Sequence, residues 1–297
     1  MAFPRYVAAL VGCLGPAAPA GAAAAQLVEG APLVAWRPAL PLQGSVVLLA
    51  MRAGEGDSVI AVRGELAGEP LHFERDADEF RALGAVPLGA GRSIAASVVV
   101  ERAGGALDTV ITSLPVGRRR AARERLRAAP EFVQPPDSVA ERIEAERELV
   151  QELRRRAHDT PRQWREPFVR PRSSAVTSGF GVARVFNGAV RSRHLGVDFA
   201  GERGAPVLAA NRGVVAFVAD LYYSGTTLYI DHGAGLVTAY LHLSRALVTP
   251  GDTVARGQLI GQVGASGRVT GPHLHWLAAY GGVTVDPLGL LNPQVAY

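Results

Sequence analysis

Four histidines and one aspartate with metal-binding or proton-transferring side chains lie in three short motifs in the C-terminal part of this 297-residue chain. His194 and Asp198 frame the segment HLGVD, His273 and His275 lie in PHLHW, and His242 lies in YLHL. Imidazole and carboxylate are donors that suit Zn²⁺, and imidazole also titrates near neutral pH. A catalytic zinc takes three protein ligands and keeps one position open. The surplus groups therefore indicate acid–base catalysis beside a metal, although the spacing alone does not assign the roles.

Strand geometry explains how these motifs could share one cavity. Residues i and i+2 of a strand point to the same face, so His273 and His275 would enter one cavity while Leu274 packs behind them. The same alternation predicts that Tyr240 and His242 share a face, which makes Tyr240 a candidate substrate-binding residue. Gly196 disfavours a helix between His194 and Asp198, so we expect a loop that leads into a strand there.

The whole chain is predicted to be mainly β. Short runs rich in Val, Ile and Leu, separated by Gly, Asp and Pro, predict a β-sandwich-like domain over residues 28–116. A charged helical linker is predicted over 117–167, and a compact antiparallel β domain without long helices over 168–297. The runs expected as strands are 45–51, 58–63, 70–74, 93–101, 107–113, 206–210, 213–219, 226–231, 236–242, 253–254, 259–263 and 274–279.

The net positive charge of the chain lies in the predicted linker. Residues 118–170 contain 14 arginines and 10 acidic residues, a net charge of +4, and the rest of the chain is balanced at 17 and 17. Asp137 or Ser138 is expected to cap a helix that ends at Arg154-Arg155-Arg156. Two interpretations remain open: a connecting helix with one packed stripe, or an arginine-rich contact to anionic wall polymer or lipid headgroups.

The first 25 residues predict export. One charge at Arg5, an apolar stretch and a run of small residues that ends near Ala25 are typical of a secretory signal. The alternative is a lipoprotein signal in which Leu10-Val11-Gly12-Cys13 makes Cys13 the lipid anchor. No segment predicts a transmembrane span in the mature chain, because Gly and Pro interrupt the N-terminal stretch. The protein is therefore expected in the periplasm or cell envelope.

Composition excludes several functions. All 31 basic residues are arginine, so no cofactor that needs a lysine amine can be attached. The single cysteine excludes an internal disulfide and a multi-cysteine metal site. Because the excess positive charge belongs to one segment, the basic pI does not indicate a nucleic-acid-binding protein.

Residues 176–288 resemble the lysostaphin-type, or LytM-type, zinc endopeptidases of the bacterial cell wall. The resemblance rests on TSGFG at 177–181, HLGVD at 194–198, IDHGAGLVTAYLHLS at 230–244 and PGDTVARGQLIGQVGASGRVTGPHLHW at 250–276. It implies a LytM-like fold with a duplicated hybrid motif and one Zn²⁺ per chain. It also implies that His194, Asp198 and His275 bind the zinc, and that His242 and His273 act as the acid–base pair while metal-bound water attacks the scissile carbonyl.

The same resemblance implies a substrate and leaves alternatives. The partner would be the stem peptides of peptidoglycan, with either D-Ala–diaminopimelate or glycine-bridge cross-links, and direct cross-links are favoured because no glycine-binding module is visible. Asn187 could replace a tyrosine that some members carry before the first zinc histidine, although Asn-Gly is also typical of a hairpin turn. The alternatives are a non-catalytic LytM-like domain that activates another hydrolase, and a biotinyl or lipoyl carrier, which the missing lysine excludes. The sequence names no regulatory partner.

Overall fold

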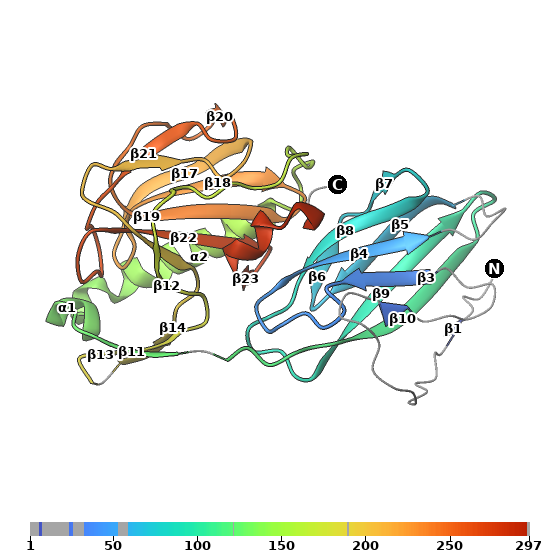
Figure 1. Cartoon of the computed structure of the whole chain (residues 1–297), viewed down its shortest axis with the longest axis horizontal. Helices are drawn as coiled ribbons and strands as arrows, with labels where there is room; N and C mark the ends of the chain where they lie inside the picture. Colours follow the sequence, from blue (N-terminus) through green and yellow to red (C-terminus); the bar gives the residue numbers. More distant parts are fainter. Residues whose placement is uncertain are drawn as a thin grey trace. The chain divides into compact units, whose positions relative to one another are not determined.

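The computed structural model describes residues 6–7, 24–25, 33–52, 59–120, 122–188 and 190–295, and it is mainly β, as predicted (Figure 1). The chain forms two compact units that divide between Arg119 and Arg120. The predicted boundaries at 28–116, 117–167 and 168–297 stay predictions, and most of the predicted linker lies within the second unit. Cys13 and most of residues 1–25 lie outside the described residues, so the signal and the lipid anchor also stay predictions.

The first unit contains the predicted sandwich of two β-sheets. Their strand orders are β1-β10-β9-β5-β6 and β2-β3-β4-β8-β7. Alternate side chains of both sheets, such as Leu49 and Met51 from one and Val98 and Val100 from the other, form one apolar core. The bounds are β1 (Tyr6–Val7), β2 (Ala24–Ala25), β3 (Leu33–Arg37), β4 (Val46–Arg52), β5 (Val59–Leu66), β6 (Glu69–Leu71), β7 (Glu74–Asp76), β8 (Glu79–Ala85), β9 (Ser93–Arg102) and β10 (Leu107–Pro115).

A large antiparallel sheet forms the body of the second unit. Its strands follow the order β12-β15-β22-β19-β18-β17-β20, and β16, β21 and β23 pair beside this path. The central strands are buried on both faces, so they read as nearly continuous apolar runs. The bounds are β12 (Val176–Ser178), β15 (Val197–Ala200), β16 (Pro206–Leu208), β17 (Gly213–Leu221), β18 (Gly225–Gly233), β19 (Leu236–Ala246), β20 (Thr253–Val254), β21 (Leu259–Val263), β22 (His273–Tyr280) and β23 (Val283–Val285).

A second, three-stranded sheet of this unit consists of β11 (Arg123–Leu126), β13 (Ala183–Phe186) and β14 (Val190–Arg193). The charged composition predicts a helix over Arg123–Leu126, but this segment is the strand β11, so the prediction is wrong for these residues. The sequence Arg-Glu-Arg-Leu alternates with a period of two, so its two arginines are exposed and its other two side chains are half-buried. Parallel pairing with β13 then satisfies the backbone of the segment.

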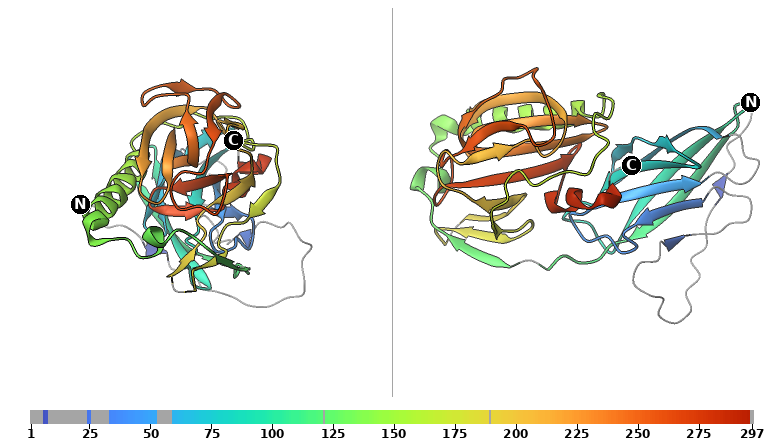
Figure 2. Two further views of the ribbon diagram at one scale, coloured as in Figure 1. Left: turned by 90° about the vertical axis from the view of Figure 1, so that its left-hand side faces the viewer. Right: turned by 45° about the horizontal axis from the view of Figure 1, so that its top comes forward.

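Helices are few in the described part of the second unit. They are α1 (Pro130–Val133), η1 (Asp137–Val139), α2 (Ala140–Arg156), η2 (Pro287–Leu291) and η3 (Pro293–Val295). Helix α2 lies against one face of the large sheet (Figure 2), where Val150 and Leu153 pack on a buried cluster that includes Val237 and Leu277. This confirms one packed stripe, and the predicted end of the helix is also confirmed.

The predicted cap of α2 is wrong. Neither Asp137 nor Ser138 caps the helix with its side chain, because both lie in a short 3₁₀ turn and Val139 takes the cap position. None of the helices in the described ranges combines the length and the hydropathy needed to cross a bilayer.

Candidate metal centre

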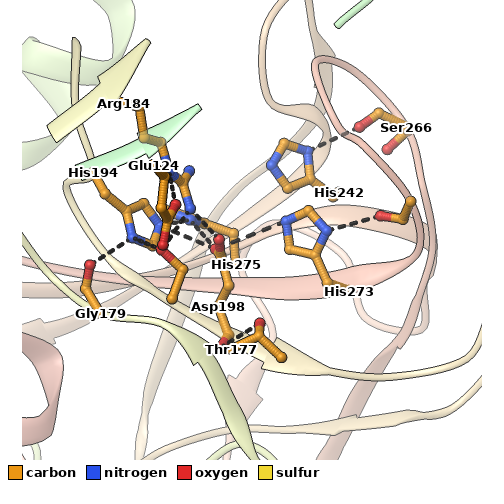
Figure 3. Close-up of polar contacts among 12 residues, drawn as sticks. Glu124, Thr177, Gly179, Arg184, His194, Asp198, His242, Ser266, His273 and His275 are labelled. Atoms are coloured by element: carbon orange, nitrogen blue, oxygen red, sulfur yellow. Dashed lines mark hydrogen bonds and ion pairs between the residues drawn. The ribbon is translucent and has the colours of Figure 1, made fainter. Parts of the chain in front are cut away.

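Strands β15 and β22 bring together the three residues predicted to bind a metal. Asp198 lies directly opposite His275 in the pairing of the two strands, and His194 lies in the segment just before β15. The Nε2 atom of His194 lies 3.0 Å from Oδ1 of Asp198 and 2.9 Å from Nδ1 of His275. The Nδ1 atom of His275 lies 2.8 Å from the same oxygen. All three side chains are buried, and their ligand atoms converge on one point (Figure 3).

Hydrogen bonding assigns the lone pair of His194 to that point. Its Nδ1 lies 2.8 Å from the carbonyl oxygen of Gly179, which can only accept, so Nδ1 is the protonated nitrogen and Nε2 carries a lone pair. A backbone carbonyl on the far ring nitrogen is the usual support of a metal-binding histidine. The tautomer therefore suits a metal ligand.

The protonation states of the other two ligands point the same way. Burial lowers the pKa of His275 to about 4, so the imidazole is neutral near pH 7. Burial alone would raise the pKa of Asp198, but the close ring nitrogens of His194 and His275 more than offset it and hold the pKa well below its usual range. Two imidazoles and one carboxylate fit a catalytic zinc site, which takes three protein ligands of this kind.

Arg184 of β13 binds the carboxylate from the other side and was not identified from the sequence. Its guanidinium donates to Oδ2 of Asp198, and its Nη2 donates to Oγ of Ser178 at 2.9 Å. Its Nε lies 3.3 Å from Glu124 of β11. Arg184 thus occupies the second oxygen of Asp198 and leaves Oδ1 for a metal. Nothing in the spacing of the motifs distinguishes it from the other arginines of the chain.

His242 and His273 lie beside the three ligands, as predicted for an acid–base pair. The ring of His242 lies 5.0 Å from that of His273 and 5.9 Å from that of His275. The Nδ1 atom of His242 donates to the carbonyl of Ser266 at 2.8 Å, and that of His273 donates to the carbonyl of Gly271 at 2.8 Å (Figure 3). Both Nε2 atoms therefore carry lone pairs.

Burial, and then the neighbouring imidazoles of His275 and His273, lower the pKa of His242 to about 3. Together with Asp198, the two histidines His242 and His273 line a pocket of about 380 Å³. The pocket thus presents two imidazoles next to the three ligands.

The prediction that Tyr240 shares a face with His242 is wrong. In the β19–β22 register Leu241 lies opposite His275, so strict alternation would point His242 away from the ligands. A β-bulge corrects this, because two residues of β19, Leu241 and His242, lie opposite the single residue Thr227 of β18. His242 adopts a left-handed φ of 62°, which turns its side chain into the cluster.

Tyr240 and Asn187 are not brought to the cluster. Tyr240 is fully buried, and its hydroxyl accepts from the backbone N–H of Ala210 at 2.8 Å, while burial raises its pKa to about 12. Asn187 lies at the turn between β13 and β14, where its amide exchanges hydrogen bonds of 3.1 and 2.9 Å with the backbone of Ala128. Neither residue lines the pocket that contains His242 and His273.

Comparison with known proteins places this geometry among peptidases. Residues 192–287 match Peptidase family M23. The chain is 39% identical over 121 residues to the peptidoglycan DD-endopeptidase ShyC of Vibrio cholerae, and this match covers 40% of this chain and 28% of the relative. It is 49% identical over 83 residues to ShyA of the same organism, and this match covers 28% of this chain and 19% of the relative. The chain therefore matches less than a third of the length of these curated relatives.

A solved structure extends the likeness beyond the matched domain. A peptidase M23 protein from Pseudomonas aeruginosa superposes with a TM-score of 0.65 at 26% identity, over 85% of this chain and 95% of that protein. The likeness therefore extends well beyond residues 192–287.

Proposed function

Because residues 192–287 form a Peptidase family M23 domain, we propose that this protein is a zinc-dependent endopeptidase that hydrolyses peptide cross-links of peptidoglycan. The convergence of Nε2 of His194, Oδ1 of Asp198 and Nδ1 of His275 on one point carries the proposal. The relatives named peptidoglycan DD-endopeptidases support the class of substrate. Such a substrate also supports a place in the cell envelope, as the N-terminal sequence predicts.

These three residues would hold one zinc ion and leave its fourth position to water or substrate. When bound, zinc supplies Lewis acidity at the scissile carbonyl. The protein holds the ligands in place through Gly179, which orients His194, and through Arg184, which binds the second oxygen of Asp198. Such outer hydrogen bonds fix the geometry and basicity of the ligands.

His242 and His273 would move the protons of the hydrolysis. With Nδ1 bound to a carbonyl, the Nε2 atom of His242 is free to accept a proton from the attacking water. The proton then passes to the leaving amine as the C–N bond breaks, so each turnover returns the imidazole to its neutral state. The ring of His273, 5.0 Å away, is placed to share this transfer or to stabilise the developing oxyanion.

The second candidate function is a non-catalytic domain that binds the wall and activates another hydrolase. Such a domain needs neither the ligands nor the acid–base pair. Here the three ligands and both additional histidines lie within one site, and the tautomers of His194, His242 and His273 suit their roles. This completeness favours the enzyme.

The test separates metal binding from proton transfer. Purified protein should contain about one zinc per chain by elemental analysis and should release peptides from isolated sacculi, as measured by mass spectrometry. Asp198→Ala should lose the zinc and the activity, whereas His242→Ala should keep the zinc and lose at least a hundredfold in rate. His72→Ala, in the first unit, is the matched control. A zinc-free protein with full activity, or a fully active His242→Ala variant, would contradict the proposal.

A further inference from the structure

Arg268 stands out among the groups of the pocket that the proposed reaction does not use. It lies on the loop between β21 and β22, and it lines the pocket together with His242 and His273. Its guanidinium carbon lies 4.5 Å from the ring centre of Phe186 and 4.7 Å from that of Tyr223. Two aromatic rings therefore hold the cation in place while leaving its N–H donors unused by the rings.

The acidic groups of the pocket are engaged elsewhere. Its lining contains two carboxylates, those of Glu124 and Asp198, and both pair with Arg184. Within the described part of the chain no ion pair or side-chain hydrogen bond is found for the guanidinium of Arg268. Burial lowers its pKa from the usual value, yet arginine stays charged at any physiological pH. A half-buried cation without a counter-ion thus lies in a substrate pocket, where charge is costly unless it is paired.

The loop that carries Arg268 also orients His242. The carbonyl of Ser266 accepts from Nδ1 of His242 at 2.8 Å, and the backbone N–H of Arg268 donates to Tyr223 at 2.8 Å. The crossing of this loop over Gly225 is tight, because a Cβ on Gly267 would lie 2.4 Å from the backbone nitrogen of Gly225. The position of Arg268 relative to His242 is therefore fixed by the backbone.

From this arrangement we infer that Arg268 is the carboxylate subsite of the pocket and selects cross-links whose scissile amide nitrogen carries a neighbouring carboxylate. This inference rests on the proposed function and deepens it. The diaminopimelate side of a direct cross-link presents such a carboxylate beside the leaving amine, whereas a glycine bridge presents none there. Arginine binds a carboxylate with two parallel N–H donors, so the contact also orients the scissile bond toward His242.

The test compares two synthetic cross-links that differ in one group. Both contain D-Ala joined through its carbonyl to the side-chain amine of diaminopimelate, with either a free carboxylate or a carboxamide next to the scissile nitrogen. Wild-type protein should hydrolyse the carboxylate form with a kcat/KM about tenfold to a hundredfold higher, the range expected for one charged hydrogen-bonded contact. Arg268→Met should remove this preference, so that the values of kcat/KM on the two forms differ by no more than about twofold.

Arg191→Met is the matched control, because it removes an exposed arginine of β14 that does not line the pocket. It should keep the preference. Zinc content of every variant reports correct folding of the site, and Arg268→Gln serves as a second variant if Arg268→Met loses zinc. Equal rates on the two cross-links in the wild type, or an unchanged preference in the Arg268 variants, would overturn the inference.

Binding separates this inference from the proposed function. If neither cross-link is hydrolysed, the proposed function fails, and calorimetry with the two product amines still decides the role of Arg268. Tighter binding of the carboxylate product, by tenfold or more and lost in Arg268→Met, supports the subsite. Equal binding of the two products rejects it.

Discussion

Gly196 offers a way to displace a metal ligand without removing it. A Cβ built on this residue would lie 2.5 Å from Nε2 of His275 and 2.5 Å from the backbone oxygen of Trp276. Ordinary contacts of a Cβ begin near 3.4 Å, so the overlap is about 0.9 Å at each atom. The oxygen of Trp276 belongs to the central strand β22, which is paired on both sides and cannot yield. The imidazole of His275 must therefore move.

The expected magnitude follows from that displacement. A shift of nearly 1 Å far exceeds the tolerance of about 0.2 Å for a metal–ligand distance. Gly196→Ala should weaken zinc binding at least tenfold, comparable to the loss of an outer-shell contact, and should cost about 1–3 kcal/mol of stability through overpacking. Competition with a chromophoric chelator measures the affinity, and urea unfolding of the metal-free protein measures the stability.

The control for this variant lies in the same cluster. Gly179→Ala adds a Cβ that meets nothing within 4 Å, and its carbonyl can still accept from His194. It should bind zinc like the wild type. If Gly196→Ala also bound zinc like the wild type and kept its stability, the packing of Gly196 against His275 would not control the site, and the reasoning from this contact would be refuted.

Two further predictions concern charged and titrating groups of the same unit. Arg184→Met removes the donor to Oδ2 of Asp198 and should weaken zinc binding about tenfold to a hundredfold. The control variant Arg193→Met should bind zinc like the wild type. Equal zinc affinities of Arg184→Met and the wild type in a chelator competition would contradict the supporting role of Arg184. Burial lowers the pKa of the fully buried His232 to about 4 from 6.5, so its contribution to stability is complete above pH 6.5 and is lost as the pH falls toward 4, by about 3 kcal/mol. Urea unfolding between pH 7 and pH 4 should show a smaller loss of unfolding free energy in His232→Asn than in the wild type. An equal loss in the two proteins would reject this assignment.

The strands of the second unit were predictable where the sequence forms nearly continuous apolar runs. The apolar runs predicted at 236–242 and 274–279 are confirmed as strands, which extend over Leu236–Ala246 and His273–Tyr280 in the centre of the large sheet. The strand at Arg123–Leu126 was missed because three charges in four residues outweighed its alternation. The segment forms a strand because it pairs with β13. That partner lies about 60 residues further along the chain, so local sequence patterns do not reveal it.

The ligands and the acid–base pair differ in what a pattern can locate. Asp198 and His275 follow from regular pairing of two strands, and alternation within β22 places His273 beside them. His242 does not follow, because the same alternation would send it to the face of Tyr240. Its place in the site requires the bulge opposite Thr227, the left-handed backbone, and the carbonyls of Ser224 and Ser266 that bind its backbone N–H and its Nδ1. A bulge costs paired backbone contacts, and here it supplies the one imidazole that regular pairing would bury in the core. The bulge in β19 is therefore the feature that places His242 beside the metal ligands, where the proposed proton transfer requires it.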